Sequence, residues 1–300
     1  PGLAKAAFHA TRTDRWGLAV DLSFFVVDAG YRPILQVECD VLGDDVMACR
    51  NTGIVLTPLA PAAEAAFPLA LRQVLVNAHW LGVEEIMVQT WDDDDVPAVH
   101  DWLAEHRAMM CAMRHARVDL RRPMADILAD FRQTHRNLTR WGLANLHFAS
   151  SFADSPPALV HAYHQLAVRD RRGQIESEAV LGQRLERGEI SLHAAGHGAS
   201  PETMVLVSYC GGDIAYYGGA VRIRDQGKSS APALMYRIMA ELRERGIAEF
   251  VLGDLLDGAG GDAKMHGIAA FKAGFTKSFR PGKWGCARSG MMPSCLDLEG

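Results

Sequence analysis

The sequence predicts an α/β protein with a mixed β-sheet, on two observations. Short apolar runs with strand-like alternation are interleaved with longer segments of helical periodicity along the chain. Between residues 216 and 249, an apolar run, a turn of small residues at 226–230, a helical segment and a second apolar run follow one another. This order predicts a βαβ unit, whose turn gathers backbone N–H groups at a helix N-terminus and so stabilises an anion such as phosphate.

The composition is that of a globular protein, with 49% hydrophobic and 22% charged residues in a chain of 300. This length allows one large domain or two of ordinary size. The apolar runs are too short to span a membrane and no signal-peptide pattern opens the chain, so we expect a cytoplasmic protein. The six cysteines form no CxxC pair, which suits a reducing compartment and argues against a zinc knuckle.

The first predicted domain, residues 1–122, shows the order strands, helix, strand, helix. Residues 16–50 alternate as in a β-meander, and residues 61–81 have helical spacing that stops before Gly82, a common helix-ending residue. A short strand follows. Four aspartates at 92–95 then precede a helix, where they either complement its N-terminal dipole or hold a metal. We prefer the first role, because no His or Glu follows at ligand spacing.

The second predicted domain, residues 123–300, begins with a helix. Pro123 suits the first helical position, and the helical pattern continues to Gly142. Three arginines recur every four residues and so share one face, beside His135: Arg132, Arg136 and Arg140. Such a basic face is either ordinary solvated surface or a site for a polyanion.

From residue 146 the predicted order of elements is β, α, α, β, β, β, α, β, α, β. They are expected near residues 146–149, 157–172, 177–187, 190–195, 203–210, 214–223, 231–246, 250–252, 265–273 and 287.

Charge is unevenly distributed along this chain. The net charge is −5, yet residues 112–143 hold seven arginines against three aspartates, and residues 263–292 hold six lysines or arginines and no acid. The two basic segments either form a local polyanion site or are ordinary surface.

The element order, with a phosphate-type turn between the fourth strand and the third helix, resembles the acyltransferase fold of the GNAT superfamily. The turn of that fold has the pattern R/Q-x-x-G-x-G/A and cradles the pyrophosphate of acyl-coenzyme A. In this chain Arg224 and Gly227 match the pattern, Lys228 occupies a variable position, and Ser229 stands where a second Gly or Ala is expected.

Two further strings are similar to the Fem-type (FemABX-like) peptidyltransferases: HRNLTRWGL at 135–143 and GIAAFKAGF at 267–275, with its F-K-x-G-F pattern. The resemblance implies tandem GNAT-like domains, the first one shortened, that transfer an amino acid from aminoacyl-tRNA to an amino group. The acceptor would be a peptidoglycan precursor or a peptide or nucleoside intermediate of antibiotic biosynthesis. The resemblance implies no cofactor, since aminoacyl-tRNA is the co-substrate.

The same resemblance implies roles for individual residues. Phe271 and Lys272 would lie beside the ester, with the Lys272 ammonium stabilising developing negative charge. Asp254 is the carboxylate nearest the end of the strand after the phosphate turn, and it is either a base or a cap of the following loop. Tyr216 and Tyr217 alternate along a strand, so one should face the cleft and the other the core.

The tRNA acceptor end would meet the phosphate turn and the basic segments. The residues predicted to bind it or the substrate are Arg132, Arg136, Arg140, Tyr216, Arg224, Gly227, Lys228, Ser229 and Lys277. No metal is expected, because the histidine pairs 161/164 and 193/197 lack a third ligand at useful spacing. Two other hypotheses remain open, an acyl-coenzyme A-dependent N-acyltransferase and a non-catalytic binding protein of the same fold.

Overall fold

A computed structural model describes the chain over twelve stretches. They are residues 18–42, 46–48, 55–83, 85–91, 101–102, 104–105, 109–170, 176–198, 200–209, 212–223, 227–256 and 263–288. The fold has two compact units: one contains residues 115–255 and 261–279, and the other contains residues 2–114, 256–260 and 280–300. The predicted aspartate run at 92–95 lies outside the described residues.

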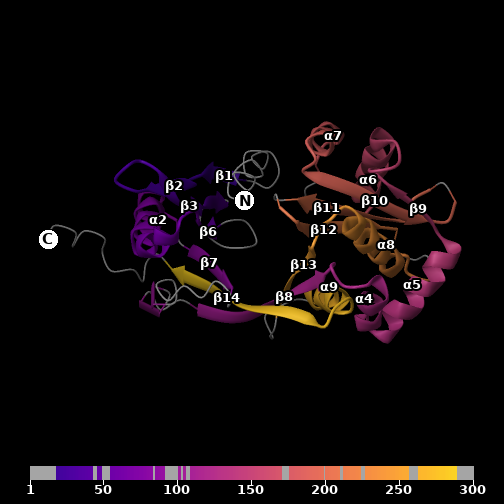
Figure 1. Cartoon of the computed structure of the whole chain (residues 1–300). Helices are drawn as coiled ribbons and strands as arrows, with labels where there is room; N and C mark the ends of the chain where they lie inside the picture. Colours follow the sequence, from indigo (N-terminus) through magenta and orange to yellow (C-terminus); the bar gives the residue numbers. More distant parts are fainter. Residues whose placement is uncertain are drawn as a thin grey trace. The chain divides into compact units, whose positions relative to one another are not determined.

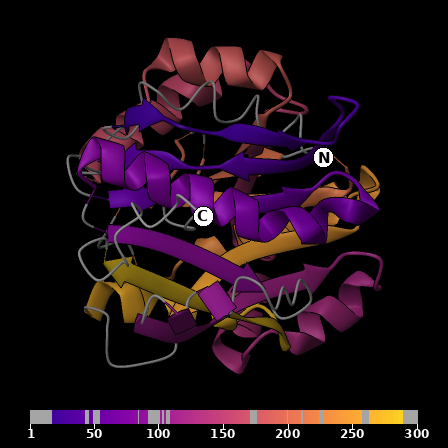
Figure 2. The same cartoon turned by 90° about the vertical axis from the view of Figure 1, so that its left-hand side faces the viewer.

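The N-terminal unit contains two groups of strands and one long helix. Its elements are β1 (Leu18–Asp21), β2 (Phe24–Val27), β3 (Pro33–Glu38), β4 (Asp40–Leu42), β5 (Val46–Ala48), β6 (Val55–Pro58), η1 (Pro61–Ala66), α2 (Phe67–Leu81) and β7 (Glu85–Trp91). One group has the order β2-β3-β6, and the other has β1-β4-β5-β7 followed by β14 (Ser278–Arg288). Figure 2 shows α2 lying across these strands.

The predicted helix at 61–81 forms as a 3₁₀ turn that leads into α2. Phe67, Leu71 and Val74 lie on its buried face, as the helical spacing predicted. Gly82 ends the helix in the left-handed region, at φ 66°, which a residue with a side chain rarely adopts. The short strand predicted after it is β7.

The C-terminal unit has a mixed sheet. Its strands follow the order β8-β13-β12-β11-β10-β9, and the elements are β8 (Met109–Asp119), α4 (Met124–Asp130), α5 (Gln133–Asn145), β9 (His147–Ser150), α6 (Pro156–Arg169), α7 (Glu178–Glu186), β10 (Ile190–Gly196), β11 (Thr203–Tyr209), β12 (Ile214–Arg222), α8 (Ala231–Glu244), β13 (Glu249–Leu256) and α9 (Ala263–Ala273). The element order predicted from residue 146 onward is confirmed.

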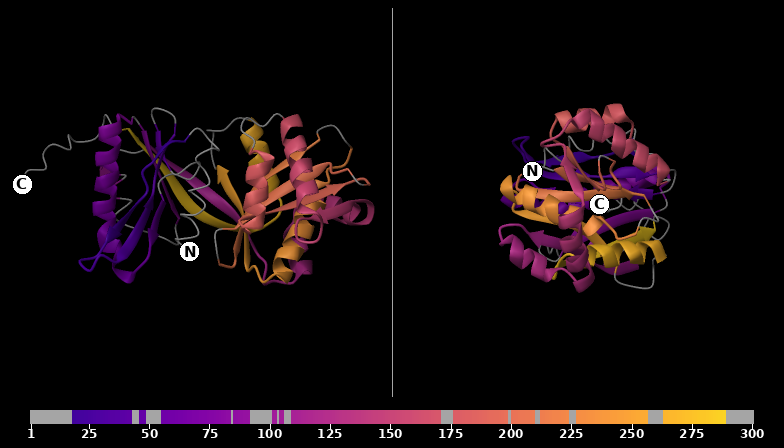
Figure 3. Two further views of the ribbon diagram at one scale, coloured as in Figure 1. Left: turned by 90° about the horizontal axis from the view of Figure 1, so that it is seen from above. Right: turned by 90° about the vertical axis from the view of Figure 1, so that its right-hand side faces the viewer.

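Helices cover both faces of this sheet (Figures 1 and 3). On one face, α6 and α7 pack on a core that includes Leu192, Met204 and Val221. On the other face, α4, α5, α8 and α9 share a core with Val205 and Phe250. Strand alternation therefore sends successive side chains of β10, β11 and β12 into two separate cores, which explains their nearly continuous apolar sequences.

The prediction of one helix from 123 to 142 is wrong, because the chain breaks at Phe131 and Arg132. Phe131 is extended (φ −59°, ψ 142°) and its side chain is fully buried, edge-on to Phe275 at 5.1 Å between ring centroids. The Arg132 amide donates to the Gly274 carbonyl at 2.9 Å. No local breaker occurs here, so packing against the end of α9 overrides helical propensity.

Gly142 does not end its helix either, since α5 continues to Asn145. A Cβ on Gly142 would lie 2.3 Å from the Ala233 Cβ of α8. The glycine instead permits close approach of α5 to α8, and Thr139 Oγ1 donates to the Pro232 carbonyl at 3.2 Å beside it.

Two further observations concern the chain as a whole. Among the described residues, no helix is both long and apolar enough to cross a membrane. The compact units place residues 280–288 of β14 with the N-terminal unit, whereas the sequence suggested a simple division at 122/123. The interpretation of the N-terminal unit as a shortened GNAT-like half stays a prediction.

Candidate active site

Two parallel strands part at the centre of the C-terminal unit. The pairing of β12 with β13 covers Ile214–Tyr216 and Glu249–Val251, and beyond these the described residues of the two strands do not pair. At the same level β12 contains a bulge, because Leu206 of β11 faces Gly219 and Val207 faces Tyr217. Gly218 is therefore the extra residue, which bends β12 away from its neighbour.

The glycine at the bulge has a steric reason. A Cβ on Gly218 would lie 2.5 Å from the Leu206 Cδ2 and 3.2 Å from the Leu206 carbonyl oxygen. The neighbouring Gly219 has φ 135°, a conformation that residues with side chains rarely adopt. Parted strands next to a bulge expose main-chain polar groups, which is a common arrangement beside active sites.

The phosphate-type turn leads from β12 into α8. Gly227 has φ 44° and Ser230 precedes the first residue of α8, as the predicted turn requires. The Ser230 hydroxyl does not cap the helix; it is buried and hydrogen-bonded to Thr203 Oγ1 at 2.7 Å. Pro232 in the first turn has no N–H, so this helix N-terminus has fewer donors for an anion than an ordinary one.

The turn's side chains are only partly described. Lys228 is exposed and its Nζ lies 5.4 Å from the centroid of the Trp141 ring, while Ser229 is half-buried. Arg224 lies outside the described residues.

Lys272 lies in the last turn of α9, and its ammonium points at β13. A Cβ on Gly253 would lie 2.9 Å from the Lys272 Nζ, so the absence of a side chain at Gly253 makes room for the lysine. Gly253 follows the paired part of β13, where β12 and β13 have parted. The predicted catalytic lysine is thus half-buried beside the parting of the strands.

Asp254, the predicted base, is the residue after Gly253 in β13. The Asp254 side chain is not among those that the structure describes. Asp254 therefore directly follows the glycine that lies beside the Lys272 ammonium. Its role as a base stays a prediction.

A hydrogen-bonded histidine supports the turn that carries Lys272. His135 is 1% exposed; it accepts from Arg132 Nε at Nδ1 (2.7 Å) and donates from Nε2 to the Phe271 carbonyl (3.2 Å). Burial, aided by the nearby Arg132 charge, lowers the His135 pKa to about 4. The ring is therefore neutral at physiological pH with its proton on Nε2, as its two hydrogen bonds require.

The two strings that resemble the Fem-type enzymes contact each other here. The His135 ring lies 4.5 Å from the Phe275 ring and 5.5 Å from the Phe271 ring, between centroids. Gly274 is needed for this approach, because its Cβ would lie 2.7 Å from His135 Nε2 and 2.9 Å from Arg132 Nε. The sequence did not identify this role of His135, although its place inside one string offered a signal.

The predicted basic face is largely occupied by structural contacts. Arg136 donates to the Ala129 carbonyl at 3.1 Å and to the Phe131 carbonyl, and so satisfies acceptors at the end of α4. Lys277 forms an ion pair with Asp130 at 3.5 Å. The Arg140 side chain is exposed and has no hydrogen bond or ion pair with any residue that the structure describes. Contact of Arg140 with a ligand stays a prediction.

The two tyrosines of β12 face opposite sides of the sheet. Tyr217 pairs with Val207 and packs into the core beneath α8, whereas Tyr216 pairs with Ser208 on the face covered by α6 and α7. Each is half-buried. The core residue of the predicted pair is therefore Tyr217, and contact of Tyr216 with a substrate stays a prediction.

Each histidine of the two predicted pairs lies beside a carboxylate. His161 and His164 both lie near Glu178, at 3.0 and 3.6 Å, and His197 Nδ1 lies 2.8 Å from Glu202. Across the described part of the chain, no three His, Cys, Asp or Glu side chains converge in a way that could hold a metal ion.

His193 belongs to a buried polar chain that the sequence did not indicate. Its Nε2 lies 2.8 Å from the Ser191 hydroxyl, which lies 2.7 Å from the Tyr209 hydroxyl, and its Nδ1 lies 3.3 Å from Glu241. Burial raises the pKa of Tyr209 to about 12. These groups join β10 and β11 to α8 near its C-terminal end, away from the phosphate-type turn.

Comparison with known proteins identifies the fold. No protein-family model and no curated protein matches the sequence. Among solved structures, FemX is similar with a TM-score of 0.60 at 10% identity, over 88% of this chain and 87% of that chain. The C-terminal domain of a putative lysylphosphatidylglycerol synthetase from Agrobacterium fabrum gives 0.61 at 15% identity, over 92% and 86%.

A third structure, a tandem GNAT protein from the clavulanic acid biosynthesis pathway, gives a TM-score of 0.51 at 14% identity, over 89% of this chain and 82% of that chain. At such identities the likeness extends to the fold alone. Together with the parted strands, the bulge and the turn before α8, these likenesses show that the chain has the GNAT fold.

Proposed function

We propose that the protein is an aminoacyltransferase that moves an amino acid from aminoacyl-tRNA to an amino group of a peptide-type acceptor. The observation that carries this proposal is the Lys272 ammonium beside Gly253, where β12 and β13 part. The acceptor is a peptidoglycan precursor or a peptide or nucleoside intermediate of antibiotic biosynthesis.

The reaction is aminolysis of an ester. The acceptor nitrogen attacks the ester carbonyl, a C–N bond forms, and the C–O bond to the ribose of the tRNA breaks. The departing ribose oxygen takes up the proton that the amine loses, so the step balances without a further reactant. Lys272 stabilises the negative charge on the carbonyl oxygen in the transition state, and His135 and Phe271 hold the turn that carries it.

Three features favour an aminoacyl-tRNA donor over coenzyme A. Ser229 stands where the coenzyme A pattern has a second Gly or Ala, and Pro232 removes a donor from the helix N-terminus. The likeness to FemX, at a TM-score of 0.60, exceeds the likeness to the tandem GNAT protein, at 0.51.

The second candidate is an acyl-coenzyme A-dependent N-acyltransferase. The left-handed Gly227 favours it, because this conformation shapes the turn for close approach of a pyrophosphate to the backbone.

The test is a transfer assay with purified protein, a mixture of charged tRNAs and candidate acceptor peptides, read as the mass added to the acceptor. We expect RNase to abolish the product and desulfo-coenzyme A to leave it unchanged. Product formed only from an acyl-coenzyme A would establish the second candidate. Product from neither donor would support a non-catalytic binding protein.

A variant tests the lysine. Lys272→Met should lower kcat/KM by about 10² to 10³, the usual cost of losing one oxyanion-stabilising group. The control His266→Gln, an exposed position on the same helix, should keep the wild-type rate. Wild-type activity in Lys272→Met would remove the lysine from the mechanism.

A further inference from the structure

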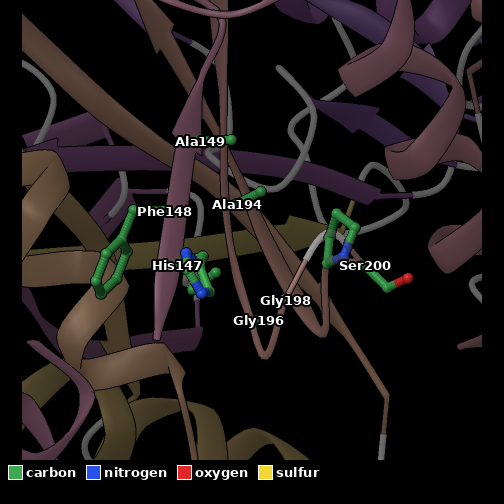
Figure 4. Close-up of a pocket in the computed structure, with 9 residues that line it drawn as sticks. His147, Phe148, Ala149, Ala194, Gly196, Gly198 and Ser200 are labelled. Carbon is green, nitrogen blue, oxygen red and sulfur yellow. The ribbon is translucent and has the colours of Figure 1, made fainter. Parts of the chain in front are cut away.

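A cavity of about 410 Å³ lies at the edge of the C-terminal unit, beside β9 and β10 (Figure 4). Its described lining includes Phe148, Ala194 and Pro201 and contains no lysine, arginine or acid. Such a lining does not select a charged ligand. A surface of the N-terminal unit, the outer side of α2, has a more specific pattern.

The side of α2 that faces away from the core is apolar along its centre. Helical spacing aligns four residues there, which we call the α2 seam: Leu69, Gln73, Val76 and Trp80. Leu69 is 60% exposed and Trp80 is 81% exposed. A solvated helix normally has charged residues on this side, yet α2 contains one arginine, Arg72, and no lysine or acid. The helix is therefore apolar on both sides, although only one side is covered.

The spacing of the α2 seam is that of helices that pair. Its successive members are four, three and four residues apart, which is the a/d repeat of a coiled coil. The one polar member, Gln73, occupies a kind of position where a single polar residue fixes the register of such pairs. Exposed Leu and Trp side chains at this spacing indicate that a second helix covers them.

A second copy of α2 fits this seam in the antiparallel orientation. In a pair with twofold symmetry, positions equally far from the midpoint of the contact face each other. With the midpoint between residues 74 and 75, Leu69 meets the partner's Trp80, and Gln73 meets the partner's Val76. Every position of the α2 seam then has a counterpart in the partner's seam.

The charges of α2 permit the same arrangement. Arg72 and His79 are exposed and lie on one flank of the α2 seam, seven residues apart. The twofold axis brings this flank beside the same flank of the partner, so Arg72 comes next to the partner's His79. The two arginines stay separated by five residues along the helix axis, which is about 7.5 Å. No two arginines are therefore directly opposed.

The size of the contact predicts a weak dimer. The 15 residues of α2 form a helix about 22 Å long. A contact of this length between two helices is small beside standard interfaces, which bury about 1,200 Å² or more in total. Monomer and dimer should therefore exchange at micromolar concentrations.

We propose that the protein forms a twofold-symmetric dimer in which the α2 seams of two copies pack antiparallel. The dimer does not rest on the proposed function, because it involves a surface of the N-terminal unit and requires no substrate.

Sedimentation velocity of the purified chain from about 1 to about 200 μM tests the dimer, since weak pairs of this size have Kd values on the order of 10–100 μM. Trp80→Ala should raise Kd at least about tenfold, because a central Trp is commonly a binding hot spot. The control Val168→Ala shortens an apolar side chain on α6 that is 51% exposed, and its Kd should match the wild type.

Substitutions at His79 test the antiparallel register. His79→Glu places a carboxylate beside the partner's Arg72 and should lower Kd about threefold to tenfold relative to His79→Gln, through two exposed ion pairs. His79→Lys should raise Kd by a similar factor. The charge control Gln183→Glu, at an exposed position on α7, should leave Kd unchanged.

Three results would overturn the proposal: a monomer at every concentration, wild-type dimerisation of Trp80→Ala, or equal Kd values in the three His79 variants. Flotation with vesicles of phosphatidylglycerol and phosphatidylcholine identifies the competing occupant. A monomer that floats with these vesicles, and does so only when Trp80 is present, would assign the α2 seam to a membrane surface and refute the dimer.

Discussion

His135 shows how one buried residue can link two distant strings of this sequence. It receives a hydrogen bond from Arg132 and donates one to the Phe271 carbonyl, next to Lys272. Both bonds exist together only in the neutral ring with its proton on Nε2. Protonation would place a second donor against Arg132, and burial opposes the charge as well.

Stability should therefore fall in mild acid. The unfolded ring takes up a proton near pH 6.5 and the folded ring only near pH 4, so the unfolded state binds more protons between these values. We expect the free energy of unfolding to drop by about 3 kcal/mol from pH 6.5 to pH 4 through this group, at 1.36 kcal/mol per pKa unit.

Urea unfolding across this pH range measures the effect. His135→Gln removes the titrating group, so its pH dependence should be shallower than that of the wild type, whatever its absolute stability. Equal slopes in the two proteins would show that His135 does not remain neutral in the folded state.

Sequence spacing predicted where the residues of the candidate site lie better than it predicted the contacts that their side chains make. The F-K-x-G-F string led to Lys272, and the spacing of Arg132, Arg136 and Arg140 placed them on one side of the chain. Spacing could not show that Arg136 binds carbonyls at the end of α4, because those carbonyls are exposed only by the break at Phe131. That break depends on contact with Phe275, which is remote in sequence.

At the scale of elements, the order of strands and helices was predictable and the contacts between helices were not. Alternation and helical periodicity are local, so they gave the order from β9 to β14. Gly142 illustrates the limit. A glycine near the end of a helical pattern usually indicates termination, yet here it lies inside α5 and faces Ala233 of α8.

Replacing Gly142 tests this packing. The Cβ of Gly142→Ala would lie 2.3 Å from the Ala233 Cβ, so α5 must move away from α8. We expect a loss of about 1–3 kcal/mol in the free energy of unfolding, the usual cost of overpacking. This loss should exceed the gain in helical propensity.

The matched control is Gly182→Ala in α7, where an added Cβ meets nothing within 4 Å. This variant should gain up to about 1 kcal/mol, because alanine favours a helix more than glycine does. Chemical denaturation of the two variants and the wild type measures both changes in the free energy of unfolding. A gain in both would mean that α5 and α8 are not in close contact at Gly142.

At the scale of the whole molecule, charge alone is a poor guide to the partner. A net charge of −5 disfavours nucleic acid on average, yet Lys228, Arg140 and Arg237 are all exposed in the C-terminal unit near the turn that precedes α8 or on the helices packed there. Counterion release depends on the cations that touch phosphate and not on the sum over the chain. The proposed tRNA partner can therefore be tested by salt dependence.

Binding of a charged tRNA should depend on salt through these cations. The double variant Arg140→Gln with Lys228→Gln should lower the magnitude of the slope of log K against log[salt] by about 1 to 2, since each lost phosphate contact on a single strand contributes roughly 0.7. Affinity should fall equally for tRNAs of different sequence, because phosphate contacts carry no base information. The control Arg72→Gln with Arg243→Gln changes the net charge by the same amount at exposed positions on α2 and at the end of α8, and its slope should match the wild type. Equal slopes in the two double variants would mean that the cations near the turn do not contact phosphate and that only overall charge acts.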